Sequence, residues 1–186
     1  MAYQIAAVNI PEIAQKEILF TPMPMIKDKE ALKKIHDHSA EKIMELLQKG
    51  KKIGFLTLGD PTIYSTYLYL HNRVAQKGFS TEIISGIPSF CAAAARLNKG
   101  LVENRQELHV IPASYGVAEA LKLSGTKVLM KSGKKLKEVK EDVKKTGQKI
   151  QMVEDCGMAT EQVYNSTEEI PDTGSYYSLI IVKEEK

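Results

Sequence analysis

Two short turns hold the residues of this sequence that are best placed to do chemistry. The first turn, Gly59-Asp60-Pro61, follows an apolar run from Ile53 to Leu58 that is short enough for a buried strand, and it precedes a helical pattern. At this position the carboxylate of Asp60 can meet a ligand, while Pro61 sets the first turn of the helix. Asp60 could equally cap that helix. The residues alone leave both interpretations open.

The second turn, Ser85-Gly86-Ile87-Pro88, ends the apolar pair Ile83-Ile84 and opens a helix of small residues from Cys91 to Ala95. Strand, turn and helix therefore occur twice in succession, which predicts parallel strands joined by helical crossovers. Ligands bind beyond the carboxyl ends of such strands. We expect the site at these two turns.

Several other kinds of site are not supported. Asp60-Pro61 stands where a phosphate loop would need Lys and Ser or Thr, and the sequence contains no GxGxxG for a dinucleotide. Cys91 has no histidine or second cysteine near it in sequence. His36 and His38 are two residues apart on a predicted helix and so point to different faces. We predict no metal site.

Three strings together carry a family resemblance: LGDPTIYST from Leu58, SGIPSFCAAAARLN from Ser85, and LHVIPASY from Leu108. They resemble the tetrapyrrole methylases that use S-adenosylmethionine (SAM). Within that family the chain most resembles the enzymes that methylate carbon 20 of precorrin-2 or its cobalt complex in cobalamin (vitamin B12) biosynthesis. The resemblance implies an α/β fold of two domains, with SAM bound in the cleft between them.

The same resemblance implies which residues contact SAM, by matching each motif position in this sequence. The implied residues are Leu58, Asp60, Ile63, Ser65, Thr66, Ser89, Phe90, Met130, Gly157, Tyr177 and Ser178. A proton must leave the methylated carbon, and we predict Asp60 as the general base that accepts it. Asp60 could instead orient SAM or the substrate. Because precorrins carry many carboxylates, Arg73, Arg96 and Arg105 are candidate substrate contacts.

The domain boundary is predicted at the break Pro112–Gly116, which gives an N-terminal α/β domain of residues 1–112 and a C-terminal α/β domain of residues 113–186. Members of the resembled family normally begin with a strand and a loop close to GVGPGDP. Here the chain opens with a helix tail, Ala2 to Ile10, and a strand is expected around Glu17 to Phe20. We interpret the first domain as truncated at its start, and a natural variant lacking that element is the alternative.

Composition describes an ordinary globular protein. The 26 basic and 23 acidic residues are interspersed and leave a net charge of +3, so no broad field for nucleic acid is expected. Two cysteines, with no signal peptide and no long apolar span, predict a reduced, cytoplasmic protein that does not enter a membrane. The resemblance adds the expectation of a homodimer.

The leading prediction is a SAM-dependent C-methyltransferase that methylates carbon 20 of precorrin-2 or cobalt-factor II, a small-molecule tetrapyrrole substrate. One alternative is a non-catalytic remnant of the same fold that binds SAM or a tetrapyrrole. Another is methylation of protein or RNA by a relative of this fold.

Overall fold

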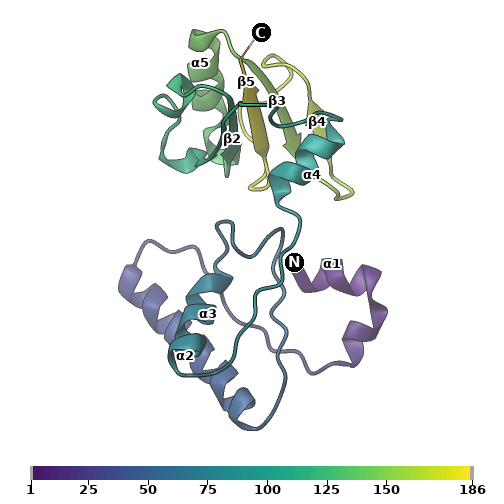
Figure 1. The fold of residues 1–186 in the computed structure, drawn as a ribbon, viewed down its shortest axis with the longest axis vertical. Coiled ribbons are helices and arrows are strands. Elements are labelled where there is room, and N and C mark those ends of the chain that lie inside the picture. Colours follow the sequence, from purple (N-terminus) through teal and green to yellow (C-terminus); the bar gives the residue numbers. More distant parts are fainter. Residues whose placement is uncertain (1, 185–186) are drawn as a thin grey trace. The chain divides into compact units, whose positions relative to one another are not determined.

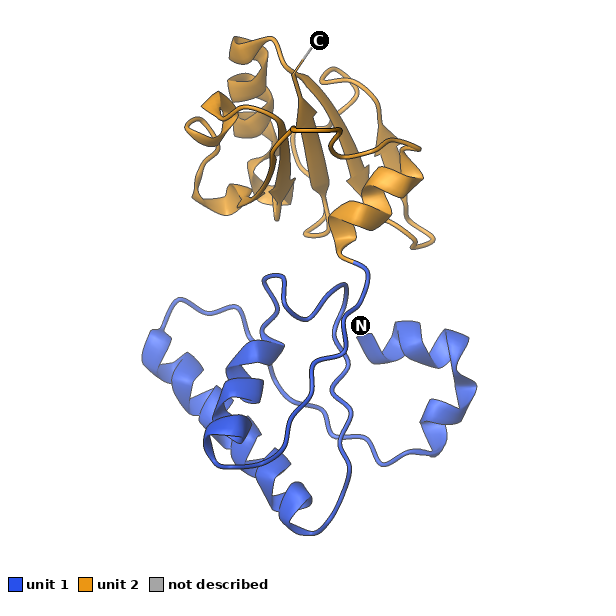
Figure 2. Ribbon diagram, viewed as in Figure 1, with its two compact units in different colours: residues 1–87 blue, residues 88–186 orange. Residues whose placement is uncertain are grey.

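The structure is a computed structural model in which residues 2–184 are described. The chain forms two compact units that divide between Ile87 and Pro88 (Figure 2). Each unit has its own buried core, so each is described by itself.

The first unit is helical (Figure 1). Its elements are α1 (Ala2–Asn9), the 3₁₀ helix η1 (Pro11–Gln15), α2 (Lys29–Gln48) and α3 (Tyr67–Gln76). Asp28 caps α2, since its carboxylate accepts hydrogen bonds from the backbone N–H groups of Glu30 and Ala31, both at 3.0 Å. No helix among residues 2–184 is both long and apolar enough to cross a membrane.

The core of this unit lies between α2 and α3. Four buried residues form it: Ala40, Ile43, Leu70 and Val74. The partly buried rings of Phe55 and Phe79 pack against them, one from the segment before α3 and one from the segment after it. Both segments that lead to the predicted turns are therefore anchored on the helix pair.

The strands predicted in this part of the chain are not present among its described residues. Neither the run from Ile53 to Leu58, nor Ile83-Ile84, nor Glu17 to Phe20 has a strand partner. The expected burial is also missing, because Leu56 is 46% exposed and Ile84 is 80% exposed. A strand needs a ladder of hydrogen bonds to a neighbour, and an apolar run alone does not supply one. The prediction of parallel strands here was wrong.

The second unit is built on one five-stranded mixed sheet. Its strands are β1 (Leu108–Pro112), β2 (Thr126–Met130), β3 (Lys149–Glu154), β4 (Gln162–Tyr164) and β5 (Leu179–Lys183), in the order β1-β2-β5-β3-β4. The β1–β2 pair is parallel, and all other pairs are antiparallel. Its helices are α4 (Ser89–Arg96), α5 (Leu136–Thr146) and the 3₁₀ helices η2 (Ala113–Tyr115), η3 (Ala120–Lys122) and η4 (Gly133–Lys135). The predicted α/β class is confirmed.

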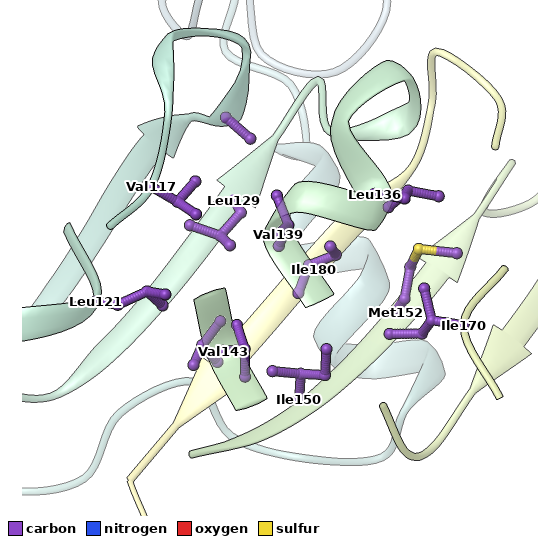
Figure 3. Close-up of a cluster of buried hydrophobic side chains, with 12 residues drawn as sticks. Val117, Leu121, Leu129, Leu136, Val139, Val143, Ile150, Met152, Ile170 and Ile180 are labelled. Carbon is purple, nitrogen blue, oxygen red and sulfur yellow. The ribbon is translucent and has the colours of Figure 1, made fainter. Parts of the chain in front are cut away.

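The core of the second unit lies between α5 and one face of the sheet (Figure 3). Leu129, Ile180 and Met152 lie side by side in the strand register and face this core. From α5, Leu136, Val139 and Val143 are buried against them, as their helical spacing predicts. Gly147 ends the helix in a left-handed conformation, with φ 67°.

The boundary between the units lies earlier than the predicted one at residues 112 and 113. Residues 88–112 belong to the second unit because β1 pairs with β2 along its whole length and α4 packs against β5. The hydroxyl of Thr126 also donates to the carbonyl oxygen of Leu101 at 2.6 Å. These contacts are distant in sequence, so the break at Pro112 did not reveal them.

Candidate functional site

Asp60 is the best-connected residue of the first predicted turn. Its side chain is buried, and its Oδ1 accepts hydrogen bonds from the backbone N–H (2.8 Å) and the hydroxyl of Thr62. Its Oδ2 accepts from the hydroxyl of Ser85 (2.5 Å) and from the N–H of Gly86 (3.0 Å). The two predicted turns therefore meet, as expected, and Asp60 joins them. These hydrogen bonds to the charged form hold the pKa of Asp60 far below that of an ordinary carboxyl.

The other predicted residues of the first unit lie in the same loop, residues 58–66. Leu58 and Thr66 are exposed, and Ile63 and Ser65 are half-buried. The hydroxyl of Ser65 is 3.2 Å from that of Thr57 and accepts the N–H of Tyr67 at 3.3 Å, which ties the loop to the start of α3. The loop therefore presents apolar and hydroxyl groups on an anchored backbone.

In the second unit, one edge of the sheet gathers most of the remaining predicted residues. Pro112 of β1 lies opposite Met130 of β2, and Met130 lies opposite Leu179 at the start of β5. Leu179 in turn lies opposite Val153, one residue before the end of β3. The carboxyl ends of β1, β2 and β3 thus meet the amino end of β5. Met130 and Ser178 are brought together at this edge.

Hydrogen bonds fix the segment that precedes β5. Ser178 is buried, its hydroxyl donates to the carbonyl oxygen of Ser175 at 2.7 Å, and its own carbonyl accepts the hydroxyl of Ser132 at 3.2 Å. The N–H of Tyr177 donates to the hydroxyl of Ser175 at 3.1 Å. Burial, the neighbouring phenol of Tyr176 and the charge of Asp155 raise the pKa of Tyr177. Tyr177 therefore keeps its phenolic proton and can donate it in a hydrogen bond.

Gly157 lies in the loop that follows β3. Its backbone has φ 78°, and its N–H donates to Oε2 of Glu161 at 2.8 Å. Glu161 also pairs with the guanidinium of Arg96 at the end of α4. The loop is therefore held from a helix on the same unit, and Arg96 is already engaged in an ion pair.

Ser89 and Phe90 form the first turn of α4. Phe90 is buried and Ser89 is exposed. Of the arginines predicted to meet substrate, Arg73 is also engaged, with the Asp37 carboxylate at 2.7 Å.

Left-handed backbone at non-glycine residues marks three loops beside the predicted positions. Tyr64 (φ 51°), Lys131 (φ 59°) and Asp155 (φ 49°) each lie within three residues of a predicted contact. The remaining cases, Asn98 and Asn104, are asparagines, which adopt this conformation readily. Strained backbone of this kind clusters at functional sites.

Sequence reasoning missed residues that support the site. Ser85 and Gly86 were recognised as a turn and not as partners of Asp60. Glu154 was also missed, although its carboxylate accepts the N–H of Ser175. The available signal was a carboxylate directly after an apolar strand, the same signal that singled out Asp60.

Each unit by itself presents groups of the kind that line small-molecule sites. In the second unit, Met130 and Tyr177 offer half-buried apolar surface, and backbone groups of the edge loops add donors and acceptors. In the first unit, Ser65 and Thr66 offer hydroxyls.

The family model for Tetrapyrrole (Corrin/Porphyrin) Methylases matches residues 5–171. The chain belongs to this family, as its motifs predict.

Two curated relatives of this chain are named for a specific reaction. A "Probable cobalt-precorrin-2 C(20)-methyltransferase" of Methanocaldococcus jannaschii is 36% identical over 132 residues, which are 71% of this chain and 55% of that protein. The "Cobalt-precorrin-2 C(20)-methyltransferase" of Salmonella typhimurium is 29% identical over 178 residues, 92% of this chain and 75% of that protein. The chain thus spans little more than half the length of the first relative.

Solved structures show the same fold. Uroporphyrin-III C-methyltransferase from Thermus thermophilus has a TM-score of 0.64 at 20% identity, over 80% of this chain and 71% of that one. The same enzyme complexed with S-adenosylhomocysteine has a TM-score of 0.54 at 14% identity, over 85% of this chain and 74% of that one.

Proposed function

We propose that this protein transfers a methyl group from SAM to carbon 20 of precorrin-2 or of its cobalt complex in cobalamin biosynthesis. The observation that carries the proposal is the 36% identity to the Methanocaldococcus jannaschii relative, whose name specifies this reaction. The gathering of Met130, Tyr177 and Ser178 at one sheet edge supports it. The cobalt complex is the favoured substrate, because both reported relatives are named for it.

Methyl transfer from SAM requires little of the protein beyond aligning the reacting groups. Bound SAM would supply an activated methyl group, since its positive sulfur is already a leaving group. In the transfer, the carbon–sulfur bond breaks with its electrons going to sulfur, a carbon–carbon bond forms, and a proton leaves carbon 20. The site residues must hold methyl and carbon in line and exclude water. The hydrogen bonds on Asp60 weigh against its predicted role as acceptor of that proton.

Direct binding and turnover assays test the proposal. Titration calorimetry with S-adenosylhomocysteine, followed by incubation with SAM and either tetrapyrrole, should give micromolar binding and a product heavier by one methyl replacing one hydrogen. The control is Glu141→Gln on the exposed face of α5, which should behave as wild type. Binding without turnover on either substrate would support the non-catalytic alternative. A folded protein that binds neither SAM nor its product would contradict the methyltransferase, and one that also binds no tetrapyrrole would contradict the remnant.

Assembly and location form part of the same proposal. The family resemblance suggests a homodimer, and the cysteine content suggests the cytoplasm. Light scattering coupled to size exclusion should give twice the chain mass of 20.7 kDa. A monomer at micromolar concentration would contradict the dimer.

A further inference from the structure

Asp60 connects two segments of the first unit that are 25 residues apart in sequence. One carboxylate oxygen binds within its own loop, to Thr62, and the other binds across to Ser85 and Gly86. Each oxygen therefore accepts two hydrogen bonds, from one hydroxyl and one backbone N–H. A carboxylate has about four lone-pair sites, so its accepting capacity is fully used.

A general base needs a free lone pair and a pKa near the working pH. Asp60 offers neither, because all its donors stabilise the charged form and hold its pKa far below the ordinary carboxyl range. Taking up a proton would break a hydrogen bond of this cluster, and its side chain is only 7% exposed. The arrangement suits a carboxylate that stays ionised.

A second, independent observation shows how closely the two segments approach each other. A Cβ added at Gly86 would overlap the carbonyl oxygen of Gly59. Only a residue without a side chain allows this contact. Backbone therefore lies against backbone at the point where Asp60 binds across.

We propose that Asp60 is a positioning residue that clamps the loop of residues 58–66 onto the turn of residues 85–87 and so presets both for SAM. This inference rests on the proposed function, since the clamped loop carries Leu58, Ile63 and Ser65. The clamp acts through the loop backbone and takes no proton. Through this clamp, Ser85 and Gly86 also contribute to the affinity for SAM.

Four variants distinguish a positioning role of Asp60 from a role as general base. They are Asp60→Asn, Ser85→Ala, Ser85→Thr and Gly86→Ala, with Ser80→Ala at an exposed position as the matched control. The clamp predicts that Asp60→Asn and Ser85→Ala each weaken S-adenosylhomocysteine binding by about tenfold, the size of one lost charge-assisted hydrogen bond. Gly86→Ala should also weaken it, because its Cβ would push the two segments apart. Ser85→Thr keeps the hydroxyl and should retain most of the affinity. Ser80→Ala should be unchanged.

Kinetics give the second readout. For the clamp, Ser85→Ala raises KM for SAM while kcat at saturation stays within a few-fold of wild type. If Asp60 is a general base, the opposite result is expected, because removing the Ser85 hydroxyl leaves SAM binding intact and makes the Asp60 carboxylate more basic. Loss of turnover in Asp60→Asn with unchanged S-adenosylhomocysteine affinity would overturn the clamp.

Hydrogen–deuterium exchange separates failure of the clamp from failure of the proposed function. Asp60→Asn and Ser85→Ala should both speed exchange at residues 57–66 and 84–87 in the ligand-free protein, while α2 stays protected. This holds even if the wild type binds no SAM. Unchanged exchange in both segments would overturn the clamp whatever the activity.

Discussion

The carboxylate of Glu154, the last residue of β3, accepts a hydrogen bond from the backbone N–H of Ser175, just before β5. Its other oxygen accepts the phenol of Tyr164 at 3.3 Å. One side chain therefore holds the segment that carries Tyr177 and Ser178.

Replacing Glu154 with alanine should loosen this segment. The variant leaves the N–H of Ser175 without its acceptor, so the free energy of unfolding should fall by about 1–3 kcal/mol. Urea denaturation measures this, and calorimetry should show weaker S-adenosylhomocysteine binding. Glu141→Ala on exposed α5 is the control. Equal stability of the two variants would show that Glu154 does not anchor the segment.

Gly133 also packs against the segment before β5. A Cβ at this position would overlap the carbonyl oxygen of Ser175, and the carbonyl of Gly133 accepts the N–H of Gly174 at 3.1 Å. Gly133→Ala should therefore destabilise the fold by about 1–3 kcal/mol, as overpacking does. The thermal unfolding midpoint tests this. Gly54→Ala is a matched control, because nothing lies within 4 Å of its added Cβ.

Stability of the first unit should depend on His36. This imidazole is buried and stacks on Tyr69 at 5.0 Å, and burial, then the charge of Arg73, lowers its pKa from 6.5. The unfolded chain thus takes up the proton at higher pH than the folded one. Stability from this group is complete above pH 6.5 and is lost as the pH falls below it.

Chemical denaturation between pH 7 and pH 5 checks this dependence. His36→Phe keeps a ring against Tyr69 and should flatten the slope of unfolding free energy with pH. His38→Phe, at a largely exposed position, should leave the slope as in wild type. If both variants keep the wild-type slope, His36 is not the group responsible.

The two cysteines should differ in reactivity. Cys91 is exposed, whereas Cys156 is half-buried, and burial together with Glu161 raises the pKa of its thiol. Because the thiolate is the reacting form, a disulfide reagent at pH 8 should label Cys91 rapidly and Cys156 slowly. Cys91→Ser should leave only the slow phase, and Glu161→Gln should speed it. A single fast phase for both thiols would contradict the burial of Cys156.

Apolar runs of similar length had different outcomes in the two units. The apolar runs at Lys127–Met130 and Ile150–Val153 became β2 and β3 because each found a partner in β5. The same kind of run at Ile53–Leu58 did not become a strand. Strand formation depends on a neighbour, and a sequence window contains no information about one.

Contacts between residues distant in sequence also limited the prediction of the site. Asp60 and Ser85 are hydrogen bonded, so the two turns named from the sequence do meet, although the strands from which we expected this are absent from the described residues. The hydrogen bond of Glu154 was not predicted, because its partner Ser175 is 21 residues away in sequence. The contacts of SAM itself remain predictions.

The position of β5 has a consequence for how the second unit is made. β1 with β2 and β3 with β4 are pairs of neighbours along the chain, but β5 separates the two pairs in the sheet. Until residues 179–183 leave the ribosome, the nascent chain has two separate strand pairs. In each pair, the strand that will pair with β5 still has an unpaired edge. Such edges invite pairing with other chains, so this interval of synthesis is when the unit is most exposed to aggregation.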